Sequence, residues 1–120
     1  MMTRALVILP EPVEDILAGT KTEEYRSRPC NIRETVGIIK AGTKTVVATA
    51  DLTGCIERYD GYAWVLENVE ALKNPVAYVH PSGAQIWVKM APEVQKAVSR
   101  AKKSPVPKVK PVKNMPDRRW

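Results

Sequence analysis

The stretch ILAGTKTEEYRSR, residues 16–28, decides how this chain is interpreted, because a helix ends within it and a charged strand begins. Upstream, PEPVEDILAG (10–19) places proline and three acids in its first turns, puts apolar residues on one face and ends in Gly19. Downstream, EEYRS (23–27) alternates in the manner of a strand. The stretch therefore predicts a helix, a glycine turn and an extended segment dense in opposed charges.

The charges of this segment divide into two sets, because successive side chains of a strand point to opposite faces. Neither set is apolar, and an unpaired ion turned toward the interior of a small sheet costs several kcal/mol. Inward charges must therefore pair with one another or hold a ligand. The alternative is a solvated edge strand whose surface ion pairs contribute at most about 1 kcal/mol each. One set is Lys21, Glu23, Tyr25 and Ser27, and the other is Thr22, Glu24, Arg26 and Arg28.

The rest of the chain reads mainly as short strands. The segment GYAWVLEN (61–68) fits either a strand or a helical face, and we favour a strand that leaves Glu67 near its end. Asn74-Pro75 is a loop signal. The sequence predicts an α+β fold, a small barrel of five or six mostly antiparallel strands with one or two flanking helices. The other expected strands are 4–9, 36–42, 44–59 and 84–90, with a hairpin at 41–43 and a second helix at 91–103.

Charge and proline separate the C-terminus from the body. Residues 96–120 hold nine Lys or Arg against one acid, a net charge of +8, whereas residues 1–95 carry −2. From residue 104 onward, prolines alternate with lysines, a pattern typical of an extended and solvated segment. We expect a barrel over 1–90, a helix over 91–103 and a basic flexible tail over 104–120, so that general attraction to polyanions resides in the tail.

Several classes of function are disfavoured by composition. Cys30 and Cys55 form no CxxC pair, and His80 is the only histidine, so we expect no metal, and no cofactor is indicated. His80 sits in a loop and is interpreted as structural or exposed. No segment approaches the roughly 20 apolar residues that span a bilayer, and no secretory signal is present. Two isolated cysteines fit a reducing cytoplasm, which is the predicted location.

Three segments resemble the ASCH (activating-signal-cointegrator homology) domain. ILAGTKTEEYR (16–26) resembles its opening signature, a helix ending in Gly-x-Lys-Thr followed by a strand with Glu and Arg. YAWVLEN (62–68) resembles a second recurring segment, and QIW (85–87) fits the closing strand. The likeness spans roughly residues 5–90. It implies a PUA-like barrel with a central cleft near the Gly-x-Lys loop and a ligand that is RNA or a nucleoside.

Some small bacterial members that this chain resembles are N4-acetylcytidine amidohydrolases. Their catalytic set is a lysine, a threonine three residues later and a distant glutamate before an asparagine. Lys21 matches the lysine, and Glu67, followed by Asn68, matches the glutamate. Glu24 stands where the family has the threonine. The resemblance thus implies a catalytic set of Lys21, Glu24 and Glu67, in which Glu67 relays a proton or orients water.

A binding module would use the same residues without chemistry. Glu24 or Glu67 would accept from an exocyclic amine, and Lys21 and Arg26 would meet a phosphate or a carbonyl. The basic tail would add salt-dependent affinity for the backbone. A ribonuclease and a protein-interaction module remain further alternatives. The remaining expected ligand contacts are Thr22 and the rings of Tyr25, Tyr62 and Trp64, although core packing is the simpler role for Trp64.

Overall fold

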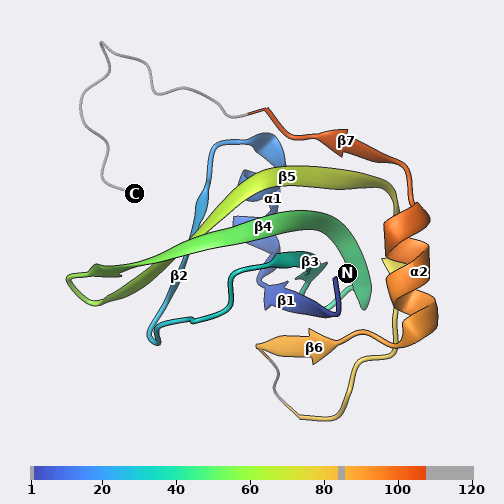
Figure 1. The fold of residues 1–120 in the computed structure, drawn as a ribbon, viewed down its shortest axis with the longest axis horizontal. Helices are drawn as coiled ribbons and strands as arrows, with labels where there is room; N and C mark the ends of the chain where they lie inside the picture. Colours follow the sequence, from blue (N-terminus) through green and yellow to red (C-terminus); the bar gives the residue numbers. More distant parts are fainter. Residues whose placement is uncertain (1, 84–85, 108–120) are drawn as a thin grey trace.

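The computed structural model describes residues 2–83 and 86–107 (Figure 1). Within them the chain forms one sheet of seven strands and two helices. The β4–β5 hairpin is long and projects from one end of the molecule, while α2 lies at the other end. The elements are β1 (Arg4–Ile8), α1 (Pro10–Ala18), β2 (Glu23–Arg26), β3 (Thr35–Lys40), β4 (Thr45–Arg58), β5 (Gly61–Ala77), β6 (Trp87–Lys89), α2 (Pro92–Arg100) and β7 (Lys103–Pro105).

The sheet has the strand order β2-β5-β4-β3-β1-β6, with β7 paired to β5 outside this path. The pairing of β1 with β3 is parallel, and the other pairings are antiparallel. The predicted α+β class and the mostly antiparallel sheet are thus confirmed. The described residues contain seven strands rather than the five or six that we expected, because β7 was not foreseen.

A closed barrel, which the sequence led us to expect, is not observed. Among the described residues the two edge strands β2 and β6 share no backbone pairing, and they are only four and three residues long. Side chains meet there instead. Trp64 of β5 stacks on Trp87 of β6 with ring centroids 6.0 Å apart, while Arg26 lies 5.5 Å from the Trp64 ring and Arg4 lies 5.9 Å from the Trp87 ring. We call these four residues the Arg-Trp stack.

Helix α1 begins and ends where the sequence predicted. Pro10 occupies its first position, where a missing N–H costs nothing. Gly19 ends it with a left-handed φ of 82°, and the amide of Gly19 donates to the carbonyl of Ile16. Val13 and Ile16 are buried against the sheet. The helix thereby fixes the starting point of the charged segment.

Strand β5 corrects the prediction for residues 61–77. It continues past Glu67 to Ala77, through the Asn74-Pro75 pair that we expected to be a loop. Asn68 has a left-handed φ of 52°, and the strand bulges at this point. The pairing of β5 with β4 then skips from Ala71 to Val76, so Pro75 stands where no N–H is needed for the ladder. Strong bulges thus allow one long curved strand where composition suggests an interruption.

The C-terminal elements also depart from prediction. Helix α2 ends at Arg100 rather than near residue 103, and β6 covers only Trp87–Lys89 of the expected strand 84–90, whose residues 84–85 lie outside the described ones. The predicted tail is corrected at its start, because β7 pairs with β5 and the Val106 amide donates to the Val69 carbonyl at 2.8 Å. Residues 108–120 lie outside the described residues.

The core consists of two groups of buried side chains. The larger lies between α1 and the sheet, and the smaller includes Val98 of α2. Both cysteines are free thiols at the larger group; Cys30 is buried, and its amide donates to the half-buried Cys55 Sγ at 3.3 Å. His80 contacts the Tyr78 hydroxyl through Nδ1 at 2.6 Å, which supports a structural role. No helix in residues 2–83 and 86–107 is long and apolar enough to cross a membrane.

Candidate functional site

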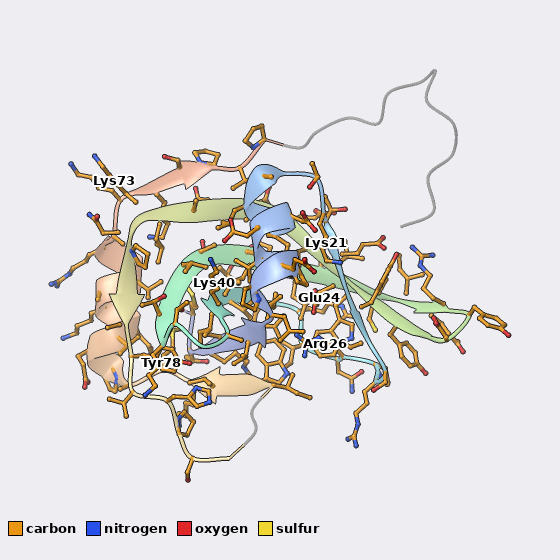
Figure 2. All side chains as sticks on the ribbon, turned by 180° about the vertical axis from the view of Figure 1, so that it is seen from behind. Lys21, Glu24, Arg26, Lys40, Lys73 and Tyr78 are labelled. Carbon is orange, nitrogen blue, oxygen red and sulfur yellow. The ribbon has the colours of Figure 1, made fainter. Side chains whose placement is uncertain are left out.

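The inward set of charges on β2 is an ion pair. Glu24 is 7% exposed and lies opposite Trp64 in the pairing of β2 with β5. Arg26, two residues later on the same face, donates from Nε to Glu24 Oε2 at 3.0 Å. The two side chains follow one another along β2 on the side of the molecule from which the hairpin projects (Figure 2). The charges that face inward therefore satisfy one another.

Arg26 also ties β2 to a distant strand. Its Nη2 donates to the Val7 carbonyl of β1 at 2.8 Å, and its guanidinium lies over Trp64. An arginine can make these contacts together because its donors form a rigid planar fork with an apolar face. Among the described residues these partners occupy both ends of the guanidinium, so Arg26 is held by the fold itself.

The outward set of β2 carries a second group of contacts. Lys21 Nζ lies 5.1 Å from the centre of the Tyr25 ring, and Tyr25 is 57% exposed. The Tyr25 hydroxyl donates to Glu23 Oε1 at 3.2 Å, and Arg58 of β4 pairs with the same carboxylate at 3.2 Å. In the described part of the chain no carboxylate lies within ion-pair distance of Lys21. The ammonium is therefore free to meet an external anion or carbonyl.

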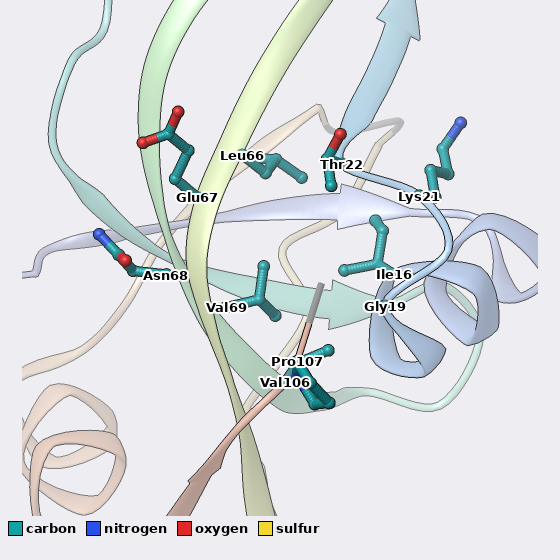
Figure 3. Close-up of a pocket in the computed structure, with 10 residues that line it drawn as sticks. All are labelled: Ile16, Gly19, Lys21, Thr22, Leu66, Glu67, Asn68, Val69, Val106 and Pro107. Carbon is teal, nitrogen blue, oxygen red and sulfur yellow. The ribbon is translucent and has the colours of Figure 1, made fainter. Parts of the chain in front are cut away.

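Lys21 and Glu67 line a common hollow between the end of α1 and the bulge of β5 (Figure 3). The amide of Leu66 donates to the Thr22 carbonyl at 2.9 Å, which joins the two walls. The apolar floor includes Ile16 and Leu66, both almost completely buried. The residues lining the hollow are Ile16, Gly19, Lys21, Thr22, Leu66, Glu67, Asn68, Val69, Val106 and Pro107.

The hollow is small, and its charged residues stand at its ends. Its volume is about 30 Å³, close to the share of one water molecule in the liquid and far below the roughly 300–1,000 Å³ of pockets that enclose ligands. Lys21 and Glu67 point outward from opposite ends, with Thr22 and Leu66 between them (Figure 3). The hollow is therefore too small to enclose a ligand of base size, and an ammonium and a carboxylate stand at its rim.

A hydrogen-bonded carboxylate lies next to this mouth. Asp51 of β4, which pairs in register with Glu67, accepts from Thr35 Oγ1 at 2.5 Å and from Asn68 Nδ2 at 2.9 Å. The Thr35 bond, followed by the Asn68 bond, lowers the pKa of Asp51 below its usual value, against a smaller opposing effect of burial. The Asp51 bond also fixes Asn68, whose backbone conformation shapes the bulge that carries Glu67.

The structure thus brings together some of the predicted site residues and separates others. Lys21, Thr22 and Glu67 line the hollow. Glu24 and Arg26 pair with each other, and Tyr25 lies on the outer face. Trp64 is 3% exposed and Tyr62 is half-buried, and both pack in the larger core group. Within the described residues no group of three or more His, Cys, Asp or Glu is placed to hold a metal ion.

Sequence reasoning missed other residues of the hollow. Asn68 entered the sequence analysis only as the neighbour of Glu67 in the resemblance, although asparagine tolerates positive φ better than most residues and so could have indicated the bulge. Val106 and Pro107 had no such signal, since their place depends on the pairing of β7 with β5 across more than thirty residues of sequence.

Comparison with solved structures shows which known proteins have a similar fold. An ASCH protein from Zymomonas mobilis superposes with a TM-score of 0.63 at 18% identity, over 82% of this chain and 95% of its own. Two single-residue variants of that protein give TM-scores of 0.62 at 19% identity and 0.59 at 16% identity, over 82% of this chain and 98% and 96% of theirs. The chain has an ASCH-type fold. No protein-family model matches the sequence, and no curated protein matches it.

The ASCH-type fold agrees with the resemblance of residues 16–26 to the opening signature of the ASCH domain. The segment from Gly19 to Arg26 forms the end of α1 and the whole of β2, in the order that the ASCH signature implies. Below 25% identity such a likeness concerns the fold alone. The chemistry of this ASCH-type domain therefore depends on the residues of its own hollow.

Proposed function

We propose that this ASCH-type domain binds RNA or a nucleoside through a pyrimidine laid across the hollow between Lys21 and Glu67. The single observation that carries the proposal is that these two opposite charges rim one apolar-floored hollow. Such a site suits a pyrimidine, because a pyrimidine has an apolar ring face and polar groups on its edge.

Each end of the hollow suits one group of the ligand. Glu67 accepts from an exocyclic amine, which cytosine has and uracil lacks. Lys21 donates to a ring carbonyl or a phosphate, and no described carboxylate competes for its ammonium. The paired Glu24 and Arg26 take a supporting part, since they hold β2, and with it the loop that carries Lys21 and Thr22, in place.

Thermal unfolding with added nucleosides tests this proposal. A ligand at 100 times its dissociation constant stabilises by about 2.7 kcal/mol, which raises the melting temperature of a domain of this size by roughly 10 °C. Cytidine should stabilise the wild type more than uridine does. Lys21→Ala should remove the shift, and Glu67→Gln should reduce the preference for cytidine because an amide can also donate to the uracil carbonyl.

Lys73→Ala is the matched control. Lys73 is exposed on β5 near α2, well apart from Lys21 (Figure 2), so its loss should leave the ligand-induced shift unchanged. Absence of any shift in the wild type at millimolar nucleoside, or equal shifts for Lys21→Ala and Lys73→Ala, would refute the proposal.

A second candidate is hydrolysis of an N4-acylated cytidine, and the placement of Lys21 and Glu67 on one hollow favours it as well. In this reaction Glu67 would orient the water that attacks the acyl carbonyl, and Lys21 would act as a general base or a nucleophile. Glu24 is engaged by Arg26 and is not at the hollow, so the pair at the rim would have to suffice. Release of cytidine from N4-acetylcytidine by the wild type, and its loss in Lys21→Ala, is the expected result. Binding of N4-acetylcytidine without release of cytidine would mean that the domain binds the base but does not hydrolyse it.

A further inference from the structure

The only two cysteines of the chain lie against each other at the border of the larger core group. Both are free thiols, and the amide of Cys30 donates to Cys55 Sγ at 3.3 Å. The Cβ atom of Cys30 is two covalent bonds from the nitrogen of that contact, so the Cys55 sulfur lies beside the Cys30 side chain. A disulfide places its Cβ atoms about 3.5–4.5 Å apart. A link would therefore need a rotation about χ1 of Cys30 and a small backbone shift rather than a rearrangement of the fold.

The backbone on both sides of the pair has room for such a shift. Residues 27–34 connect β2 with β3 without forming a helix or a strand, and Cys30 is the one buried residue among them. On the other side, the ladder of β4 with β5 is irregular between Leu52 and Gly54, directly before Cys55. Neither cysteine thus lies within an uninterrupted regular ladder that would hold its sulfur away from the other.

The two thiols differ in their access to solvent. Cys55 is half-buried, whereas Cys30 is only 6% exposed. A reagent in solution therefore meets Cys55 first, and Cys30 stays covered while it lies next to the Cys55 sulfur. Thiol–disulfide exchange uses this division, because one thiolate attacks an external disulfide and a second thiolate then resolves the mixed disulfide.

We propose that Cys55 and Cys30 are the attacking and the resolving cysteine of a reversible redox site that reacts with small-molecule disulfides. The Cys55 thiolate attacks one sulfur of the small disulfide, a mixed disulfide forms and one small thiolate leaves. The Cys30 thiolate then attacks the Cys55 sulfur, the bond between the two cysteines forms and the second small thiolate leaves. The two cysteines lose two electrons and two protons, and the small disulfide becomes two thiols. A dithiol reverses the reaction by the same steps.

The link would fasten the segment after β2 to the β4–β5 hairpin. Cys55 pairs in register with Trp64, whose Nε1 donates to the Arg28 carbonyl at 2.9 Å and whose ring lies under the Arg26 guanidinium. In the reduced protein these side-chain contacts and the bond to Cys55 Sγ hold the segment. In the oxidised protein a covalent bond would be added at the same place. This inference does not depend on the proposed pyrimidine site.

Equilibration of the full chain in buffers of reduced and oxidised glutathione tests the proposal. The wild type is equilibrated without denaturant and in urea that unfolds it, quenched with acid and alkylated, and its mass gives the oxidised fraction. Trypsin should release one disulfide-linked product that joins residues 27–33 to residues 45–58. The equilibrium constant for the link should be at least about tenfold larger in the folded chain, because the fold already holds the two sulfurs together.

Two variants test the order of attack. Cys30→Ala should stop at a mixed disulfide between Cys55 and glutathione, whereas Cys55→Ala should form the mixed disulfide on the covered Cys30 at least about tenfold more slowly. Equal rates in the two variants would overturn the assigned order. The proposal as a whole fails if the linked product is absent or if its equilibrium constant is no larger in the folded chain than in urea. These last measurements use the wild type alone, so they decide the proposal even where a variant unfolds.

Discussion

Replacement of Arg26 by methionine is the most direct test of what the charges of β2 do. The substitution keeps an unbranched apolar stem but removes the guanidinium from Glu24, from the Val7 carbonyl and from the Trp64 ring. It leaves a carboxylate that is 7% exposed without its ion-pair partner. Breaking a buried ion pair from one side costs about 3–5 kcal/mol.

The lower end of that range applies here, because the Arg26 side chain is 20% exposed and water partly replaces it. We therefore expect Arg26→Met to lower the free energy of unfolding by about 3 kcal/mol. This corresponds to a fall in melting temperature of roughly 10 °C and, for a chain of this size, to a shift of about 2 M in the urea midpoint. Urea unfolding followed by tryptophan fluorescence measures it.

Two further variants make the result decisive. Glu23→Gln removes an exposed pair with Arg58 on the same strand, which should cost at most about 1 kcal/mol. Adding Glu24→Gln to Arg26→Met should restore part of the loss, because no uncompensated charge then remains. The reasoning is refuted if Arg26→Met costs no more than Glu23→Gln, or if its cost is the same whether residue 24 is Glu or Gln.

Two other predictions concern Asp51 and the C-terminal residues. Hydrogen bonds from Thr35 and Asn68 lower the folded-state pKa of Asp51. Its carboxylate therefore stabilises the fold above its unfolded-state pKa, and this stabilisation should be lost as pH falls through the folded-state pKa. Urea midpoints measured from pH 7 down to pH 3 should accordingly decline less in Asp51→Asn than in the wild type. Glutamine at the three lysines of residues 108–113 should reduce the slope of log affinity for an RNA hexamer against log salt by about 2. The matched control replaces three exposed cations at or just after α2 by glutamine: Lys96, Arg100 and Lys102. An equal change in slope in this control would exclude a local role for the tail.

Local signals in the sequence predicted the elements that local forces build. The proline start and the Gly19 end of α1 follow from backbone geometry alone, and the two faces of β2 follow from strand alternation. Alternation also predicted that Glu24 and Arg26 share a face. It could not tell which face was inward, because that depends on the pairing of β2 with β5, about forty residues away.

The parts that escaped prediction depend on contacts between distant segments. The full length of β5 rests on bulges that let it curve along β4, and β7 exists because β5 offers it a free edge. The candidate site also depends in part on contacts between distant segments, which local signals did not predict. The motif around Lys21 located one wall, and the Glu-Asn pair at 67–68 located the other, but Val106 and Pro107 reach the hollow only through β7.

The Arg-Trp stack has a mechanical consequence for the molecule. Between β2 and β6 the sheet is bridged by rings and guanidinium groups rather than by a ladder of amides and carbonyls. Separating the two edge strands would therefore break no ladder bond between them, but it would break the hydrogen bond from Arg26 Nη2 to the Val7 carbonyl of β1. Among the described residues the contact across this seam therefore depends on a few side chains, and the loss of the Trp87 ring alone would remove both the Trp64 stack and the Arg4 contact.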